Sequence, residues 1–312
     1  MKRRVVFPDC TPYMGQFFDA AALAVVPELE LRVAKPSPAE LIEVARDATA
    51  IVHFQTRLDG AILTACPHLR IVVFLGTGVS SWVDLAAAER QGISVRRVLS
   101  YGDRTVAEHA LALILACARR IVPMDSNIRD GIWHSDALFE LAGKTLGLVG
   151  LGGIGRELAR MGAALGLRVI GWSRNAVAAN LPCELMDLDD LFRSSDIISL
   201  HLGLNDETRG IIDRRRLALM KAAAIFINTA RGGLVDQEAL VEILGQQKIA
   251  AAGLDVFAEE PLPPGHPLTR LDNVVLSAHA AWMSPEAGRR LVRLGLEALQ
   301  DELAKLGPAS AT

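Results

Sequence analysis

The stretch KTLGLVGLGGIGRELA, from Lys144 to Ala159, decides the fold prediction for this chain. Its first half is an apolar run typical of a buried strand, and its second half continues as a helix. Gly150, Gly152 and Gly155 form the pattern G-x-G-x-x-G at the junction. In that context the first glycine permits a tight turn, the second lets a pyrophosphate approach the backbone, and the third lets helix and strand pack closely. The stretch therefore predicts a dinucleotide site at a helix N-terminus.

The residues after the next strand of this unit predict which dinucleotide binds. Sites that prefer NAD usually have an acidic residue there, roughly 20 residues beyond the glycines, which binds the ribose hydroxyls. This chain has Ser173 followed by Arg174 instead. Serine removes a charge that would repel a 2′-phosphate, and a guanidinium can bind that phosphate through paired hydrogen bonds. NADP(H) is therefore the favoured cofactor, with NAD(H) possible; in the alternative interpretation Arg174 is a solvated surface residue.

On both sides of this unit, short β-rich runs alternate with helical segments, which is the pattern of parallel α/β folds. The expected strands are Arg3–Phe7, Leu29–Val33, Ala50–Phe54, Arg70–Leu75, Ile93–Val95, Lys144–Gly150, Leu167–Trp172, Asp196–Leu202, Ala223–Thr229, Ile249–Asp255 and Asn273–Ser277. A long helix is expected from Thr105 through TVAEHALALILACARR, and Ser284 and Pro285 open the last helix. The chain of 312 residues is longer than one hydrophobic core usually serves. We predict two doubly wound parallel-sheet domains of the Rossmann and flavodoxin type, one formed by 1–100 plus 284–312 and the other, 101–283, inserted into it.

Composition and charge narrow the class of protein. The formal net charge of −3 offers no basic face, so no nucleic-acid partner is expected. The four cysteines lie far apart, which is typical of reduced thiols rather than of a disulfide framework or a zinc ribbon. The apolar run at the start of the chain, before Pro8, is too short for a signal peptide, and the longest helical apolar stretch, Ala110 to Ala118, is roughly half of a membrane span. These features predict a cytoplasmic protein with no membrane partner, and the spacing of its histidines predicts no metal site.

Three further polar side chains follow expected strands, at the sheet edge where ligands of open α/β sheets bind. Arg231 follows one strand in INTARGG, Glu260 follows the next in GLDVFAEEP, and His279 follows the third in VVLSAHAAW. Taken alone, each residue has an ordinary structural interpretation: a helix-capping arginine, a solvated glutamate and a core histidine. Together, an arginine, a carboxylate and a histidine beside a dinucleotide are the groups needed for hydride transfer from the dinucleotide to a keto acid.

These segments resemble the D-isomer-specific 2-hydroxyacid dehydrogenase family, and in particular its glyoxylate and hydroxypyruvate reductases. The matching stretches are GKTLGLVGLGGIG, NTARGGLVDQEAL, GLDVFAEEPLP and the His279 segment with SPEA after it. They occur in the order and spacing of the family, from about Leu75 to Ala287. The resemblance implies an NAD(P)-dependent oxidoreductase that interconverts a 2-keto acid and a D-2-hydroxy acid. It also implies that 1–100 plus 284–312 is the substrate (catalytic) domain and that 101–283 binds NAD(P).

The resemblance assigns a role to each of the three polar side chains. Protonated His279 would donate a proton to the keto oxygen while hydride arrives from the nicotinamide. Glu260 would hydrogen-bond His279, favouring the imidazolium and fixing its orientation. Arg231 would bind the carboxylate of the substrate and polarise its carbonyl group. Glu259 competes for the role of the carboxylate, and Glu260 is preferred because the family has it directly before the proline.

Other contacts are carried over residue by residue. Gly153 and Ile154 would touch the pyrophosphate, Thr229 and Ala230 would flank the nicotinamide ribose, and Asp255 would meet the nicotinamide end. The segment LGTGV (Leu75–Val79) matches the loop whose backbone amides hold the carboxylate of the substrate, and a nest of N–H groups at such a loop suits an anion. The expected substrate-binding residues of this loop are Leu75, Gly76, Thr77 and Gly78.

The sequence departs from the family pattern at a few positions. Ala278 precedes the histidine, where the family often has proline, and Gly203 replaces a proline in HLGL. Trp282 follows His279 by three residues, where many members have glycine and the C-terminal-binding corepressors have tryptophan. Trp282 either offers an apolar wall to the substrate or packs at the domain interface. It also motivates the alternative function, a dinucleotide-sensing scaffold like those corepressors with little turnover.

The resemblance further implies a homodimer formed through the nucleotide domain. The helix that starts near Thr105 and the segment around Trp133 are the expected contact surfaces. Within the family, a formate dehydrogenase is disfavoured because its histidine pairs with a glutamine. A phosphoglycerate dehydrogenase with a regulatory tail is also disfavoured, whereas a short phosphoglycerate enzyme or a phosphite dehydrogenase stays open.

Overall fold

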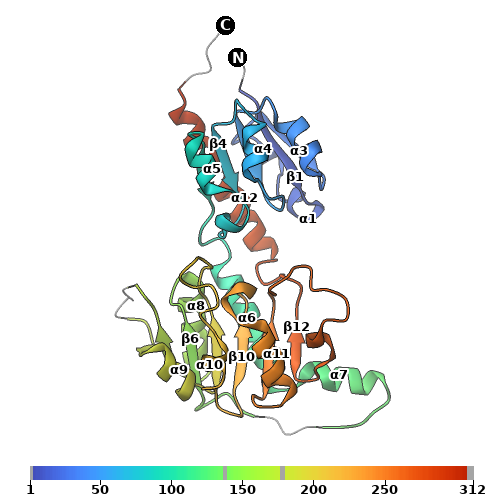
Figure 1. The fold of residues 1–312 in the computed structure, drawn as a ribbon, viewed down its shortest axis with the longest axis vertical. Coiled ribbons are helices and arrows are strands. Elements are labelled where there is room, and N and C mark those ends of the chain that lie inside the picture. Colours follow the sequence, from blue (N-terminus) through green and yellow to red (C-terminus); the bar gives the residue numbers. More distant parts are fainter. Residues whose placement is uncertain (1–2, 136–138, 176–179, 308–312) are drawn as a thin grey trace. The chain divides into compact units, whose positions relative to one another are not determined.

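The computed structural model describes residues 3–135, 139–175 and 180–307 of the chain. It divides into two compact units, one formed by Met1–Gly102 with Met283–Thr312 and the other by Asp103–Trp282 (Figure 1). Residues 1–2 and 308–312, at the ends of the expected substrate domain, lie outside the described ranges. No helix in those ranges has both the length and the apolar character that crossing a bilayer requires.

The first unit is built on a five-stranded parallel sheet in the order β2-β1-β3-β4-β5, which is doubly wound. Its strands are β1 (Val5–Cys10), β2 (Leu29–Val33), β3 (Ala50–His53), β4 (Ile71–Phe74) and β5 (Ser94–Arg97). Its helices are α1 (Pro12–Gly15), α2 (Ala20–Leu23), α3 (Pro38–Ala45), α4 (Gly60–Thr64), α5 (Leu85–Arg90), α12 (Pro285–Lys305) and the 3₁₀ turn η1 (Val79–Ser81). The C-terminal helix α12 packs against β4 and β5, so the chain returns to this unit after completing the other.

The second unit has seven parallel strands in the order β12-β11-β10-β9-β6-β7-β8. They are β6 (Thr145–Val149), β7 (Arg168–Trp172), β8 (Glu184–Leu185), β9 (Ile197–Leu200), β10 (Ile225–Asn228), β11 (Ala251–Leu254) and β12 (Val274–Leu276). The direction of winding reverses between β6 and β9, and ligands of open α/β sheets bind outside the carboxyl ends of the strands at such a point. The fold prediction is therefore confirmed for both units.

The central strands β6, β9, β10 and β11 of the second unit are buried on both faces because their side chains alternate between two apolar clusters. Its helices are α6 (Asp103–Ala118), α7 (Ile121–Arg129), α8 (Gly153–Ala164), α9 (Leu188–Ser194), α10 (Arg214–Leu217), α11 (Gln237–Gly245), η2 (Gly232–Leu234) and η3 (Pro267–Arg270). One cluster joins Ile197, Ile225 and Ile227 to side chains of α6 and α8. The other joins Ile198 and Phe226 to side chains of α9, α10 and α11.

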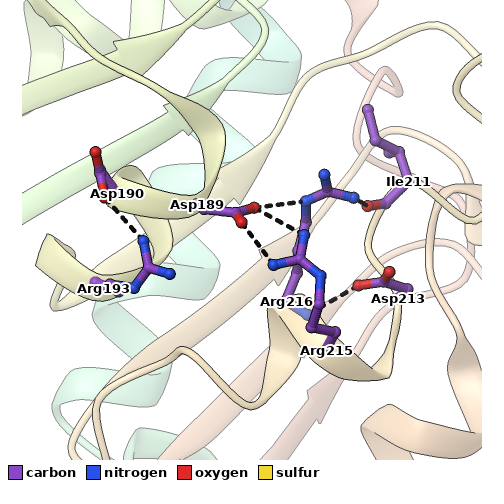
Figure 2. A network of polar contacts seen from close by, with 7 residues as sticks. All are labelled: Asp189, Asp190, Arg193, Ile211, Asp213, Arg215 and Arg216. Carbon is purple, nitrogen blue, oxygen red and sulfur yellow. Dashed lines mark hydrogen bonds and ion pairs between the residues drawn. The ribbon is translucent and has the colours of Figure 1, made fainter.

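An arginine network fixes α10 against α9 at the surface (Figure 2). Arg215 donates to both carboxylate oxygens of Asp189, at 2.5 and 3.0 Å, and Arg216 Nε donates to Asp189 Oδ1 at 3.1 Å. Arg216 also donates to the Ile211 carbonyl oxygen at 2.6 Å. The hydrogen bond from Arg215 is the main reason why the pKa of Asp189 falls to about 2. These contacts hold the connection between β9 and β10 against α9.

Candidate active site

The carboxyl ends of β10, β11 and β12 bring three of the expected polar residues to one edge of the second sheet. These strands are consecutive neighbours and all run parallel. Arg231 follows β10 by three residues, Glu260 lies in the loop after β11, and His279 lies three residues after β12. Because parallel strands end at the same edge, the topology itself gathers an arginine, a carboxylate and an imidazole there.

His279 and Glu260 are in direct contact. His279 Nδ1 lies 2.7 Å from Glu260 Oε2, and Glu260 Oε1 accepts the Phe257 N–H at 2.9 Å. Burial alone would raise the pKa of the Glu260 carboxyl, but the hydrogen bonds from His279 and Phe257, with the charges of His279 and Arg231, hold this pKa below its ordinary value. The carboxylate that meets His279 is thus ionised, and it leaves the imidazole Nε2 on the opposite side of the ring from Glu260.

The backbone of His279 adopts a left-handed conformation with φ 51°. A non-glycine residue is uncommon there, and such a conformation persists only where neighbours determine it. Asp255 does so with its carbonyl oxygen, which accepts the His279 N–H at 2.8 Å, and with its carboxylate, which accepts the N–H groups of Ala280 and Ala281 at 2.9 and 3.0 Å. The Asp255 side chain is almost fully buried. Its expected contact with the nicotinamide end of the cofactor stays a prediction.

Asn228, at the end of β10, shapes the turn that carries Arg231. Its amide nitrogen donates to the Arg231 carbonyl oxygen at 3.0 Å, and its amide oxygen accepts the Ala230 N–H at 3.0 Å. Gly232 lies so close to Phe257 that a Cβ atom would come within 1.9 Å of the Phe257 carbonyl carbon. The Arg231 turn therefore packs directly on the loop that holds Glu260. The sequence analysis missed Asn228, although an amide that ends a buried strand is a signal for such a turn.

The glycine turn after β6 has the geometry of a dinucleotide-binding turn. Gly150 has φ 103°, and a Cβ atom on Gly155 would come within 2.1 Å of the Gly150 carbonyl oxygen. Gly152, which precedes α8, has open space where its Cβ would be. A Cβ atom on Gly153 would meet the carboxylate of Asp103, a second neighbour that the sequence analysis missed. The turn thus leaves room for an approaching pyrophosphate at Gly152, at the N-terminus of α8.

Further features of this edge also fit a nicotinamide dinucleotide. The buried Thr229 hydroxyl has no hydrogen-bond partner among the described residues, and Ala230 beside it is buried. Buried polar groups normally have partners, so a hydroxyl without one suits a ligand. Ile154 is partly buried on the first turn of α8 and packs against the cluster that contains α6. The residues present therefore fit the cofactor that the glycine pattern predicts.

The two residues expected to select the cofactor lie after β7. The Ser173 hydroxyl accepts the Asn175 N–H at 3.2 Å and donates to the Asn175 carbonyl oxygen at 3.1 Å. Arg174 forms an ion pair with Glu207, which belongs to the loop after β9. Both side chains of the pair are exposed. Arg174 therefore already has an anionic partner on the protein, which the sequence analysis did not anticipate.

In the first unit, the expected carboxylate-binding loop follows β4 directly. Leu75 is buried, and the Gly76 N–H donates to the Phe74 carbonyl oxygen at 2.9 Å, so this amide is already occupied. The Thr77 hydroxyl donates to the Val98 carbonyl oxygen at 3.4 Å. Within the described ranges, the N–H groups of Thr77 and Gly78 have no acceptor on the protein. These two amides are the members of the expected nest that an anion can use.

The remaining predictions about the site concern Trp282 and metals. Trp282 is half-buried at the end of the second unit, and its role toward a substrate stays a prediction. In the part of the chain that the structure describes, no group of three or more histidine, cysteine or acidic side chains is arranged to hold a metal ion.

Comparison with known proteins identifies what the chain is similar to. Residues 111–281 match the model of the D-isomer specific 2-hydroxyacid dehydrogenase, NAD binding domain. A glyoxylate reductase of Aeropyrum pernix is 40% identical over 95% of this chain and 90% of its own, and a hydroxypyruvate reductase of Thermotoga maritima is 39% identical over 90% and 92%. An acyclic imino acid reductase solved in complex with NADPH and D-Arg has a TM-score of 0.88 at 28% identity, covering 97% of both chains.

Proposed function

The chain belongs to the D-isomer-specific 2-hydroxyacid dehydrogenase family, and we propose that it is an NADPH-dependent reductase of small 2-keto acids, with glyoxylate and hydroxypyruvate as first candidates. It is an NAD(P)-dependent oxidoreductase that acts between a 2-keto acid and a D-2-hydroxy acid. The observation that carries the proposal is the contact of 2.7 Å between His279 and Glu260, at the same sheet edge as Arg231 and the glycine turn.

Each residue of the site has one step to perform. A reduced nicotinamide, when bound at this edge, would supply the hydride for the keto carbon. His279, oriented by its contact with Glu260, gives an Nε2 proton to the keto oxygen as negative charge develops there. Arg231 holds the carboxylate of the substrate and stabilises the charge that grows on the carbonyl group. The products are the D-2-hydroxy acid and the oxidised cofactor, and His279 is reprotonated from solvent.

The two units are proposed to divide the binding of cofactor and substrate. Residues 101–283 would bind the dinucleotide through Gly150, Gly152, Gly153, Ile154 and Gly155, with Thr229, Ala230 and Asp255 toward the nicotinamide. Residues 1–100 plus 284–312 would bind the carboxylate of the substrate through the Leu75–Gly78 loop. The free amides of Thr77 and Gly78 support that assignment. Trp282 is proposed as an apolar wall beside the side chain of the substrate.

The preference for NADPH is proposed on the residues after β7. Ser173 carries no charge that would repel a 2′-phosphate, and Arg174 offers a planar guanidinium that binds phosphate in a fork. NAD(H) is the alternative cofactor, because Arg174 already pairs with Glu207.

In the described part of the chain the four cysteines form no disulfide, which supports a reducing compartment such as the cytoplasm.

A homodimer is proposed through the second unit. Large apolar side chains are exposed on α7 and in the segment after it: Ile121, Val122, Ile128, Ile132 and Trp133. Trp133 is 94% exposed, and a tryptophan left that open in one chain is typical of a residue that a partner covers.

The test is a parallel assay of NADPH and NADH oxidation with glyoxylate, hydroxypyruvate, pyruvate, phenylpyruvate and 4-methylthio-2-oxobutyrate. His279→Ala is the matched variant. We expect turnover with NADPH on at least one of the first two acids and a loss on the order of 100-fold or more in kcat for His279→Ala. A wild-type protein that binds NADPH but turns over none of these acids would contradict the proposal and favour the scaffold suggested by Trp282.

A further inference from the structure

We propose that His109 and Ser277 are positioning residues for the proton donor, and that they act through the buried carboxylate of Asp255 on the backbone of the His279 segment. This inference rests on the proposed role of His279. It gives a role to His109 and Ser277, two side chains to which the sequence analysis assigned none.

The polar contacts form a chain with a defined direction. The Ser277 hydroxyl lies 2.6 Å from Asp255 Oδ1 and 2.9 Å from His109 Nε2. Both carboxylate oxygens of Asp255 already accept backbone N–H groups, so the one hydroxyl proton of Ser277 goes to Asp255 Oδ1. His109 Nε2 must then carry a hydrogen and donate it to the Ser277 oxygen. His109 Nε2 is also 3.6 Å from Asp255 Oδ1, so this N–H points at the buried negative charge.

The same carboxylate holds the segment that carries His279. Asp255 Oδ1 accepts the Ala280 N–H and Asp255 Oδ2 accepts the Ala281 N–H, on the two residues directly after His279. If the carboxylate rotates, these two bonds cannot both be kept. His109 and Ser277 fix its rotation from the other side, by occupying Oδ1. The two backbone bonds of Ala280 and Ala281 to the Asp255 carboxylate thus depend on a chain of side-chain contacts that originates on α6.

Two features of this chain make such a support necessary. The left-handed conformation of His279 costs on the order of 1–3 kcal/mol for a non-glycine residue and must be imposed by its surroundings. Ala278, directly before it, has no ring to restrict the backbone, unlike the proline that often precedes this histidine in the family. Polar contacts from Asp255 therefore supply the restraint that the local sequence lacks.

The residue that positions the segment is buried, whereas the residue proposed to contact the substrate is exposed. The Asp255 side chain is 1% exposed, whereas that of His279 is 40% exposed. His279 is oriented by two anchors: Glu260 holds its ring, and Asp255 holds its backbone. Loss of the second anchor should displace Nε2 from the keto oxygen while leaving the cofactor turn after β6 untouched.

The experiment compares five variants of the full chain in steady-state reduction with NADPH and the best 2-keto acid. Ser277→Ala and His109→Leu break the chain of contacts. Ser277→Thr keeps the hydroxyl, and His109→Gln keeps an N–H donor. Ser195→Ala is the matched control, because Ser195 is a buried serine of the same unit whose hydroxyl donates to the Leu191 carbonyl oxygen at 2.6 Å. Thermal unfolding of each variant is measured alongside.

We expect Ser277→Ala and His109→Leu to lose about tenfold in kcat, since a small misplacement of a reacting group is costly, with the KM for NADPH changed less than about twofold. The deuterium isotope effect from C4-labelled NADPH should rise, because the chemical step becomes slower than product release. Ser277→Thr and His109→Gln should recover most of kcat, and Ser195→Ala should lose stability without losing turnover.

Two results would overturn the inference. One is an unchanged kcat in both Ser277→Ala and His109→Leu. The other is a loss of kcat that follows the loss of thermal stability across all variants, Ser195→Ala included, with no recovery in Ser277→Thr. An inactive wild type, or an active His279→Ala, would instead contradict the proposed function, so the two failures are distinguishable.

Discussion

Arg174 is the residue at which two anions compete in this molecule. Its guanidinium pairs with the carboxylate of Glu207, and the proposed complex brings the 2′-phosphate of NADPH to the same group. An exposed ion pair contributes roughly 0.2–1 kcal/mol, whereas a phosphate carries more charge and accepts a bidentate hydrogen bond. The phosphate should therefore displace Glu207, at the cost of part of its own binding energy. Glu207 would then weaken the preference for NADPH over NADH that is proposed for Ser173 and Arg174.

This competition predicts opposite effects for two substitutions. Arg174→Ala should lower kcat/KM for NADPH by about 10- to 100-fold, which corresponds to losing a charged hydrogen bond, and leave NADH within about twofold. Glu207→Gln should raise kcat/KM for NADPH by about two- to fivefold, because the guanidinium is released from its partner. The ratio of the two specificity constants is the measurement. Equal changes for NADPH and NADH in both variants would show that neither residue faces the 2′-position.

Glu260 predicts how the reduction responds to acid. Its pKa is held below the ordinary value of 4.5, so the carboxylate stays ionised at neutral and mildly acidic pH. Its support of the His279 imidazolium is therefore present above that ordinary value and is lost only as the pH falls through the lowered pKa. Glu260→Gln lacks this support throughout.

We therefore expect Glu260→Gln to reduce kcat/KM by about tenfold at pH 7, with the difference from the wild type shrinking as the pH falls below 4.5. The measurement is a pH profile of both proteins over a range in which circular dichroism shows each to be folded. A ratio that stays constant, or that grows in acid, would contradict the role given to Glu260.

The residues proposed to act on a ligand were easier to infer from the sequence than the residues that hold them. Arg231, Glu260 and His279 each follow a recognisable strand, and parallel topology brings strand ends together whatever lies between them. The Asn228 side chain contacts the turn directly after it, so its place at the end of a buried strand was a usable signal. Asp103 gave no comparable signal, because its approach to Gly153 depends on how two segments distant in the sequence meet in space. The same applies to the Ser277 hydroxyl, whose two partners are distant in the sequence.

At the scale of secondary-structure elements, the turn between β6 and α8 contains glycines required for packing and another glycine that leaves space for a ligand. A Cβ atom on Gly155 would collide with the Gly150 carbonyl oxygen, and the positive φ of Gly150 disfavours any side chain. Gly152 has open space around its missing Cβ and φ −71°, which alanine adopts without strain. Only at Gly152 should a methyl group leave the fold intact and still meet the pyrophosphate.

Gly152→Ala is therefore expected to keep a thermal midpoint within a few degrees of the wild type, since alanine at this cap costs a few tenths to about 1 kcal/mol. Its dissociation constant for NADPH should rise at least about tenfold, as measured by quenching of protein fluorescence. Gly155→Ala is the contrasting variant and should lower the thermal midpoint clearly. Unchanged NADPH affinity in a folded Gly152→Ala protein would place the pyrophosphate elsewhere.

Helices and strands were predictable from the sequence to different degrees. Every expected strand is present, with bounds shifted by a few residues, because buried parallel strands read as apolar runs. The two-residue β8 was missed, since its exposed Glu184 and Leu185 pair with β7 over too short a stretch to leave a pattern. The expected long helix ends at Ala118 rather than continuing through Arg120, which takes a left-handed φ of 45° and lets α7 begin.

At the scale of the whole molecule, α7 has a surface that a single chain leaves uncovered. Ile128 and Ile132 are 53% and 52% exposed beside Trp133. Leu185 on β8 is exposed to a similar degree, at 56%, but lies on an edge strand far from α7 in the sequence. A cluster of large apolar side chains with a tryptophan in it is the composition of the buried centre of an interface.

If this cluster is the centre of a homodimer, a charge in it must be costly, because the partner's copy places a second charge opposite by symmetry. The variant Ile132→Glu with Trp133→Glu should sediment as a monomer at concentrations where the wild type is a dimer, with a dissociation constant raised at least about 100-fold. Leu185→Glu, with the same change on an isolated exposed leucine, should stay dimeric. A wild-type protein that is monomeric at high concentration would refute the interface, and a dimer that survives the double substitution would place it on another face.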